Sequence, residues 1–124
     1  MFFILHFTLF YKLFYPVKVI GKENCIQDGK SIVICNHLGK SDVLAVGDLY
    51  KDKTYFLSKI EWFDNKPLGW IIDKLGAIPI DRDKPSISSI RSCLNVLKDN
   101  KRLAVFPEGQ RNFVDNTLLE IKQG

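Results

Sequence analysis

The sequence has few cysteines and histidines, and the two do not cluster. Its three cysteines, Cys25, Cys35 and Cys93, form no C-x-x-C pair, and an odd number leaves one thiol over in any disulfide scheme. We therefore expect a reducing, cytosolic setting. The two histidines are well separated, so we expect no metal. With 124 residues, the sequence has the length of one domain, which excludes a separate cofactor module within it.

Long apolar runs and a strong charge of one sign are also absent. The uncharged N-terminal stretch ends at Lys12, whereas a membrane-spanning helix needs about 20 apolar residues. No basic residue precedes this stretch and no small-x-small cleavage pattern follows it, which argues against a signal peptide. The net charge of +4 suits an anionic partner such as phosphate or an acidic membrane surface. It is too diffuse to indicate nucleic acid.

The first sixteen residues are aromatic and free of acidic side chains. Residues 1–16 hold five of the nine phenylalanines, and the first acidic residue is Glu23. This composition favours an interfacial helix, with apolar side chains at the acyl boundary and lysines among the headgroups. The alternative is a terminal helix packed on the protein's own core. We expect residues 1–16 to contact the cytoplasmic face of the cell membrane, as a peripheral or monotopic protein does.

After this segment, strand and helix patterns alternate. The predicted strands cover residues 17–20, 32–35, 54–57, 77–80 and 103–106. The run over 32–35 is typical of a strand buried on both faces, with Cys35 as a core thiol. Pro79 marks 77–80 as an edge strand or a bulge.

Three helices are predicted between these strands. They cover residues 42–50, residues 67–75 and a segment in which Ile87, Ile90, Leu94 and Leu97 recur at spacings of three and four. That spacing predicts an amphipathic helix whose core face carries those four residues. The alternation predicts an α/β fold, a single domain with a mostly parallel sheet flanked by helices.

A first polar motif, Asn-His-Leu-Gly-Lys-Ser-Asp at residues 36–42, follows a predicted strand. Ligands gather at such strand ends in open α/β sheets. Histidine accepts protons near neutral pH, and a carboxylate on its other nitrogen fixes its tautomer. Five helical residues rotate a side chain by about 140°. His37 must therefore lie in the strand-to-helix turn and Asp42 in the first helical turn, with Gly39 easing the bend. Alone, the pattern more often marks a structural pair.

Two familiar nucleophile and phosphate motifs are missing. Gly39-Lys40-Ser41 ends like a P-loop, but that motif needs a glycine where this sequence has Ile34. No G-x-S-x-G elbow is present, so no serine nucleophile of the hydrolase type is visible.

Two further segments carry charged residues beyond strands. In residues 106–112, Phe-Pro-Glu-Gly-Gln-Arg-Asn, proline and glycine predict a turn that presents Glu108 and Arg111 together. The arginine suits phosphate and the glutamate can accept hydroxyl hydrogen bonds. The alternative is a surface ion pair on a β-turn. Arg82, after the strand over 77–80, is either a second phosphate contact or a solvated surface arginine.

In this order, the three segments resemble the glycerophospholipid acyltransferase family. The family's blocks N-H-x-S-x-x-D, G-x-x-x-I-D-R and F-P-E-G-T-R-S are matched by residues 36–42, 76–82 and 106–112. An H-x-x-x-x-D string alone is common by chance, but all three blocks in register are highly specific. The first block departs from the family in its serine placement, and the third has Gln110 and Asn112 where the family has Thr and Ser.

The resemblance implies transfer of a fatty acyl group from acyl-CoA or acyl-carrier protein to the free hydroxyl of 1-acylglycerol 3-phosphate, a lysophospholipid. The product would be phosphatidic acid, and no cofactor or covalent acyl-enzyme would be required. His37 would be the general base and Asp42 its support. The glycerol-phosphate end would be held by four residues, Arg82, Glu108, Gly109 and Arg111.

Family members usually continue for many tens of residues past the third block, whereas this sequence stops at Gly124. We therefore expect residues 17–124 to be the N-terminal portion of an acyltransferase domain, incomplete at its C-terminus. One alternative is an inactive, membrane-associated fragment. Another is an acyltransferase for glycerol 3-phosphate or a different lysophospholipid. A phosphate-binding module without chemistry is disfavoured because it leaves the His37 and Asp42 pair without a purpose.

Overall fold

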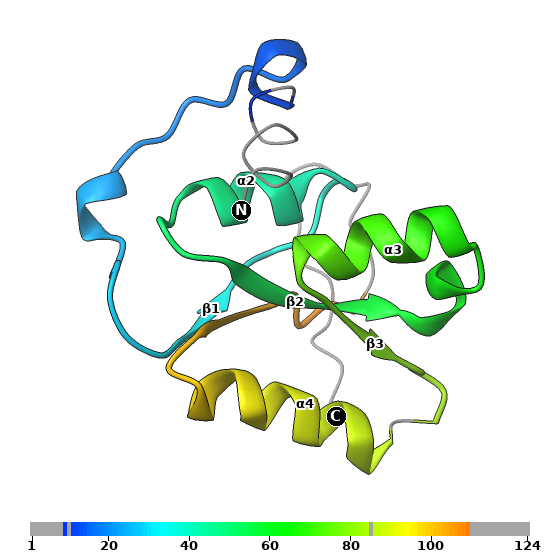
Figure 1. Cartoon of the computed structure of the whole chain (residues 1–124). Helices are drawn as coiled ribbons and strands as arrows, with labels where there is room; N and C mark the ends of the chain where they lie inside the picture. Colours follow the sequence, from blue (N-terminus) through cyan, green and yellow to red (C-terminus); the bar gives the residue numbers. More distant parts are fainter. Residues whose placement is uncertain (1–8, 10, 85, 110–124) are drawn as a thin grey trace.

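A parallel sheet of four strands organises the part of the computed structural model that is described, residues 9, 11–84 and 86–109 (Figure 1). The strands are β1 (Ser31–Ile34), β2 (Thr54–Lys59), β3 (Ala77–Ile80) and β4 (Arg102–Val105). They lie in the order β1-β4-β2-β3, and each neighbouring pair is parallel. The predicted α/β class with a mostly parallel sheet is confirmed, and among the described strands β3 lies at an edge, one of the two alternatives that Pro79 indicated.

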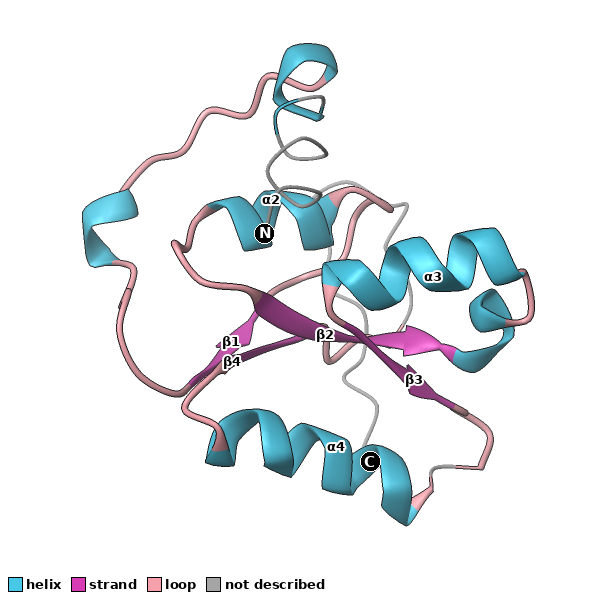
Figure 2. Ribbon diagram, in the orientation of Figure 1, coloured by secondary structure: helices cyan, strands magenta, loops and turns pink. Residues whose placement is uncertain are grey.

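Helices connect the strands and lie on both faces of the sheet. α2 (Asp42–Asp48) follows β1, α3 (Lys66–Leu75) follows β2 and α4 (Ile87–Lys98) follows β3. Two short 3-10 helices, η1 (Lys22–Asn24) and η2 (Ile60–Phe63), lie in loops. Figure 2 shows α2 and α3 on one face of the sheet and α4 on the other. The three predicted α-helices are confirmed, with ends that differ by at most two residues.

The core consists of one apolar layer on each face of the sheet, because successive strand residues point to opposite faces. Ala104 packs with Phe56 and Ile72 in the layer under α2 and α3. Its neighbour Leu103 packs with Val96 of α4 in the other layer. Both helix layers therefore hold β4, the strand that leads into the third motif.

α3 begins and ends where its sequence indicates. The Asn65 side chain accepts a hydrogen bond from the Leu68 N–H at 3.1 Å, and Pro67 lies in the first turn. Gly76 ends the helix with a φ of 102°. A Cβ at Gly76 would lie 2.9 Å from the carbonyl oxygen of Thr54, so the close approach of this turn to β2 requires glycine.

The carboxyl ends of the strands meet at one end of the sheet. Ile34 pairs in register with Val105, and the Cys35 N–H donates to the Val105 carbonyl at 3.1 Å. Lys59 of β2 pairs with Ile80 of β3. The loops after β1, β3 and β4 therefore start from the same end of the sheet. The first and third motifs follow β1 and β4, and the second motif runs through β3 and ends at Arg82 in the loop after it.

The predicted strand over residues 17–20 is wrong. The side chains of Val17, Val19 and Ile20 are exposed, and none of the four strands described above pairs with them. This segment crosses between the helical residues 11–14 and η1 at a distance from the sheet (Figure 1). β-branched residues favour a strand only where a pleated surface is available to pack on.

The prediction that the strand over residues 32–35 is buried on both faces is also wrong. In β1 the side chains of Ile32 and Ile34 are 56% and 71% exposed. Their register partners Leu103 and Val105 point toward α4, but α4 packs against β3 and β4. Among the described strands β1 is an edge strand, and Cys35 beyond it is half-buried. An apolar run indicates a strand but does not say which faces are covered.

The core face of α4 differs from the predicted one. Three of the four predicted core residues are exposed, namely Ile87, Ile90 and Leu94. The buried side carries Ser89 and Val96 instead. The Ser89 hydroxyl donates to a carbonyl of β3 at 3.0 Å, so a polar side chain can occupy the core face without an unsatisfied group.

The predicted interfacial helix over residues 1–16 lies largely outside the described residues. Residues 9 and 11–14 are helical, and Tyr11 is buried. Lys12 Nζ lies 2.9 Å from Asp48 Oδ1, which ties this segment to the last turn of α2. Within the described part of the chain, no helix has the length and apolarity needed to cross a membrane. The boundary between residues 16 and 17 stays a prediction.

Candidate active site

His37 and Asp42 are joined by a hydrogen bond at the carboxyl end of β1. His37 Nδ1 lies 2.9 Å from Asp42 Oδ2, and both side chains are largely shielded from solvent. His37 lies in the turn after β1 and Asp42 is the first residue of α2, as predicted. Because a carboxylate only accepts hydrogen bonds, Nδ1 carries the proton and Nε2 of the neutral ring keeps its lone pair. That nitrogen can accept a proton.

The Asp42 carboxylate is held by backbone as well as by the imidazole. The N–H groups of Leu38 and Gly39 donate to Asp42 Oδ2 at 2.7 and 2.8 Å. Three donors therefore fix Oδ2 of Asp42 in the absence of substrate. The expected role of Gly39 is not supported, because its φ is not positive and a Cβ would meet Asp42 Oδ1 at an ordinary 3.5 Å.

The thiol of Cys35 responds to the same carboxylate. Burial, and then the negative charge of Asp42, raise the pKa of Cys35 above its ordinary value. The thiol therefore stays protonated near neutral pH. Since the nucleophilic form of cysteine is the thiolate, Cys35 is not set up to attack an acyl group.

Phe106 lies against the ring of His37. The ring centroids are 4.6 Å apart and the planes are tilted by 35°. Phe106 directly follows β4, the register partner of β1. Phe106 belongs to the third motif of the sequence, but no role was predicted for it. The signal that could have found it is an aromatic residue at the same end of the sheet as the histidine.

Glu108 is almost fully buried in the turn after β4. The residue is 4% exposed, and its Oε2 has no hydrogen-bond partner among the described residues. The Gly109 N–H donates to the Phe106 carbonyl at 3.0 Å, and Gly109 has a φ of 64°, which closes the turn. A buried carboxylate oxygen without a partner is rare and costly, so this oxygen is available to a ligand's hydroxyl or amine group.

Arg82 links the second motif to the third. Its Nη1 donates to the carbonyl of Gly109, which brings the loop after β3 against the turn that carries Glu108. The guanidinium has five N–H donors, and Arg82 is exposed. Only this one bond engages it among the described residues, so the other donors can bind an anion.

The six predicted site residues divide into three groups. His37 and Asp42 are in contact, and Arg82, Glu108 and Gly109 meet beside the turn after β4. Arg111 lies outside the described residues, so its predicted pairing with Glu108 stays a prediction. Within the described part of the chain, no group of three or more His, Cys, Asp or Glu side chains could hold a metal ion.

Near one end of the sheet, the described residues thus bring together a histidine hydrogen-bonded to a carboxylate, a buried glutamate oxygen without a partner among them, and an arginine. Such an arrangement can take a proton from a hydroxyl group and bind an anion. Comparison with known proteins identifies the class. The acyltransferase family model matches residues 16–124, and the chain belongs to that family.

Curated relatives make the similarity more specific. The chain is 35% identical over 103 residues to the 1-acyl-sn-glycerol-3-phosphate acyltransferase of Bacillus subtilis (strain 168), over 82% of this chain and 52% of the relative. It is 40% identical over 91 residues to the protein of that name from Streptococcus pneumoniae (strain ATCC BAA-255 / R6), over 72% and 34%. The protein of that name from Saccharomyces cerevisiae (strain ATCC 204508 / S288c) is 33% identical over 112 residues, over 87% and 37%.

The chain thus spans about half, or less, of the length of these relatives. No solved structure shows a significant match.

Proposed function

We propose that the chain carries the part of a 1-acylglycerol-3-phosphate O-acyltransferase active site that holds the general base. The reaction joins the free hydroxyl oxygen of the acceptor to the carbonyl carbon of an acyl thioester and breaks the carbon–sulfur bond. The hydroxyl proton leaves with the base and then neutralises the released thiolate. The products are phosphatidic acid and a free thiol, either CoA or acyl-carrier protein. No cofactor is expected.

The hydrogen bond between His37 and Asp42 is the observation that carries this proposal. With Nδ1–H directed at the carboxylate, Nε2 is the nitrogen that takes the proton from the acceptor hydroxyl. Asp42 then stabilises the imidazolium electrostatically. General-base assistance of this kind contributes about 10²- to 10⁴-fold in rate.

The turn after β4 supports the assignment of the acceptor. The buried Oε2 of Glu108 can accept a hydrogen bond from a glycerol hydroxyl. The guanidinium of Arg82, held beside Gly109, can bind the phosphate, and Arg111 is proposed as a second phosphate contact. The names of the relatives favour 1-acylglycerol 3-phosphate over glycerol 3-phosphate as the acceptor.

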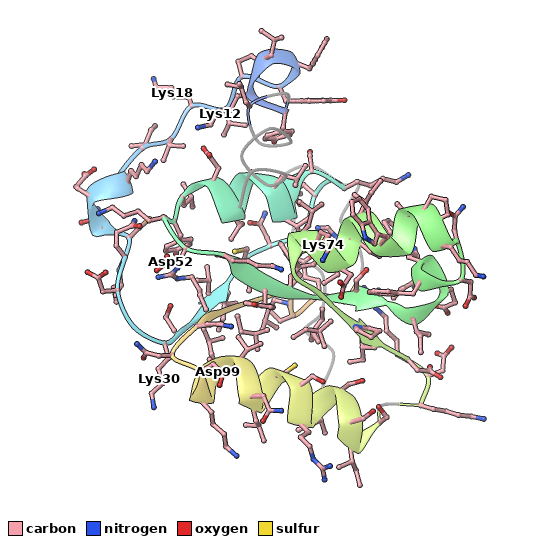
Figure 3. The ribbon with its side chains drawn as sticks, in the orientation of Figure 1. Lys12, Lys18, Lys30, Asp52, Lys74 and Asp99 are labelled. Atoms are coloured by element: carbon pink, nitrogen blue, oxygen red, sulfur yellow. The ribbon has the colours of Figure 1, made fainter. Side chains whose placement is uncertain are left out.

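The segment before residue 17 is proposed to hold the protein at the cytoplasmic face of the membrane. Leu9, Leu13 and Tyr15 are exposed, Leu13 by 77%. Lys12 and Lys18 lie beyond α2, on the side away from the sheet (Figure 3). Exposed apolar side chains beside lysines suit an interface of lipid with anionic headgroups. The ion pair between Lys12 and Asp48 would tie that interface to the helix that begins with Asp42.

Sedimentation with vesicles of phosphatidylglycerol tests the membrane assignment. Leu13→Glu, or deletion of residues 1–14, should leave the protein in the supernatant. Ile87→Glu is the matched control, because Ile87 is equally exposed but lies on α4, on the opposite face of the sheet. Unchanged sedimentation of the deletion variant would refute the assignment.

The activity itself is tested with the purified chain, a long-chain acyl thioester and lysophosphatidic acid, with thiol release as the readout. His37→Ala should nearly abolish release, and His6→Ala serves as the matched histidine control. If His37→Ala keeps more than about a tenth of the wild-type rate, His37 is not the general base. Parallel assays compare acyl-CoA with acyl-carrier protein, and lysophosphatidic acid with glycerol 3-phosphate.

A further inference from the structure

Among the described residues, a polar contact and an aromatic contact hold the ring of His37. The hydrogen bond to Asp42 fixes Nδ1 but leaves the imidazole free to swing about that contact. The ring of Phe106 lies against the imidazole at a centroid distance of 4.6 Å, with the planes tilted by 35°, and opposes that swing. The distance lies in the range of favourable aromatic pairs, about 4.5 to 7 Å.

Phe106 is itself held from both sides along the chain. The carbonyl of the preceding residue, Val105, accepts the Cys35 N–H at 3.1 Å, and the carbonyl of Phe106 accepts the Gly109 N–H at 3.0 Å. The first bond joins the chain just ahead of Phe106 to the segment that carries His37. The second closes the turn that buries Glu108. Phe106 therefore lies between the base and the turn assigned to the acceptor.

We propose that Phe106 is a positioning residue for His37. Its ring restricts the imidazole to the orientation in which Nε2 faces the acceptor hydroxyl, and it keeps water from one face of the base. Phe106 takes no proton and forms no bond with substrate in this role. The inference rests on the proposed function, because it concerns the orientation of the same base.

Phe106→Leu is the test, because leucine keeps most of the apolar volume and loses the flat ring. A small misplacement of a catalytic group can cost about 10²-fold in rate. We expect kcat to fall at least tenfold while KM for both substrates changes less than twofold. Phe106→Tyr keeps the aromatic ring and should retain most of the wild-type kcat. In the pH range where kcat no longer changes with pH, kcat of Phe106→Leu should stay below that of the wild type, since the defect is in the orientation of the base rather than in its protonation.

The matched control is Phe63→Leu. Phe63 is half-buried and packs on the apolar layer under α2 and α3, so the same substitution perturbs the core away from His37. It should lower stability without a selective loss of kcat. Circular dichroism confirms that each variant is folded. If Phe106→Leu does not fold, Phe106→Tyr and Phe106→Met carry the comparison.

A second readout does not depend on catalysis. At a centroid distance of 4.6 Å the ring current of Phe106 should shift the imidazole proton signals of His37 in the wild-type protein, and Phe106→Leu should move them toward the values of free histidine. With two histidines in the chain, His6→Ala assigns the signals. If His37→Ala is inactive but Phe106→Leu keeps kcat, the positioning role is overturned and the proposed function stands. If His37→Ala is active, the proposed function itself fails.

Discussion

The guanidinium of Arg82 donates a hydrogen bond to the carbonyl of Gly109, across 27 positions of sequence. This bond joins the loop after β3 to the turn after β4, two segments that the sequence separates by the whole of α4. A positive charge is thereby placed beside the turn that holds the Glu108 oxygen without a partner among the described residues. A ligand whose anionic group binds Arg82 would place a hydroxyl on its adjacent carbon atoms close to that turn.

Replacement of Arg82 should weaken binding of the phosphorylated acceptor. Arg82→Ala removes the planar donor and should raise KM for lysophosphatidic acid about tenfold or more, while Arg82→Lys keeps the charge and recovers part of the loss. Steady-state kinetics with a monoacylglycerol, which lacks the phosphate, provide the comparison. Arg91→Ala on the exposed side of α4 should change neither value. An equal effect of Arg82→Ala on both acceptors would contradict the assignment.

Replacement of Asp42 by asparagine should separate geometry from electrostatics. In Asp42→Asn the side-chain carbonyl oxygen can still accept from the N–H groups of Leu38 and Gly39, so the turn is preserved. A neutral amide cannot stabilise an imidazolium as a carboxylate does. We expect kcat to fall about 10²- to 10⁴-fold with a normal circular dichroism spectrum. A variant that keeps about half of the wild-type kcat would show that His37 works without its carboxylate.

The sequence alone predicted the elements whose signals are local. The contact of His37 with Asp42 depends on the six neighbouring residues 37–42, which join a strand end to a helix start, and the structure confirms the placement of both residues. The three α-helices and most strands were found in the same way, from periodicity and end signals such as Gly76.

What could not be predicted depends on elements far apart in the chain. Ile32 and Ile34 carry a strand pattern, but their exposure depends on where α4 packs. The contact between His37 and Phe106 requires β4 to lie beside β1, a pairing across about seventy residues. Strand order is a tertiary property, and periodicity within one segment contains no information about it.

The buried carboxylate of Glu108 predicts a conflict between stability and function. Among the described residues the buried Oε2 of Glu108 has no hydrogen-bond partner. Leaving a buried polar group unsatisfied costs about 1–3 kcal/mol, and more for a charged group. Glu108→Gln removes the charge and keeps the shape, so the free energy of unfolding should stay equal or rise. Activity with lysophosphatidic acid should fall. Urea denaturation followed by circular dichroism measures the first effect and thiol release the second. A clear loss of stability would mean that the Glu108 carboxylate has a partner in the free protein.

The raised pKa of Cys35 predicts slow alkylation that depends on Asp42. Burial, and then the Asp42 carboxylate, disfavour the thiolate. The pKa of Cys35 in the folded protein lies above its unfolded value of about 8.5. Cys35 therefore leaves the free energy of unfolding unchanged below the unfolded pKa and reduces it as the pH rises from the unfolded to the folded pKa.

Iodoacetamide should modify Cys35 slowly at about pH 8, and faster in Asp42→Asn, because this substitution lowers the pKa of the thiol. Burial raises the pKa of Cys93 without a contribution from Asp42. The alkylation rate of Cys93 is therefore the internal control within the same mass-spectrometric digest. Equal rates for Cys35 in wild type and Asp42→Asn, with Cys93 unchanged, would show that the carboxylate does not act on the thiol.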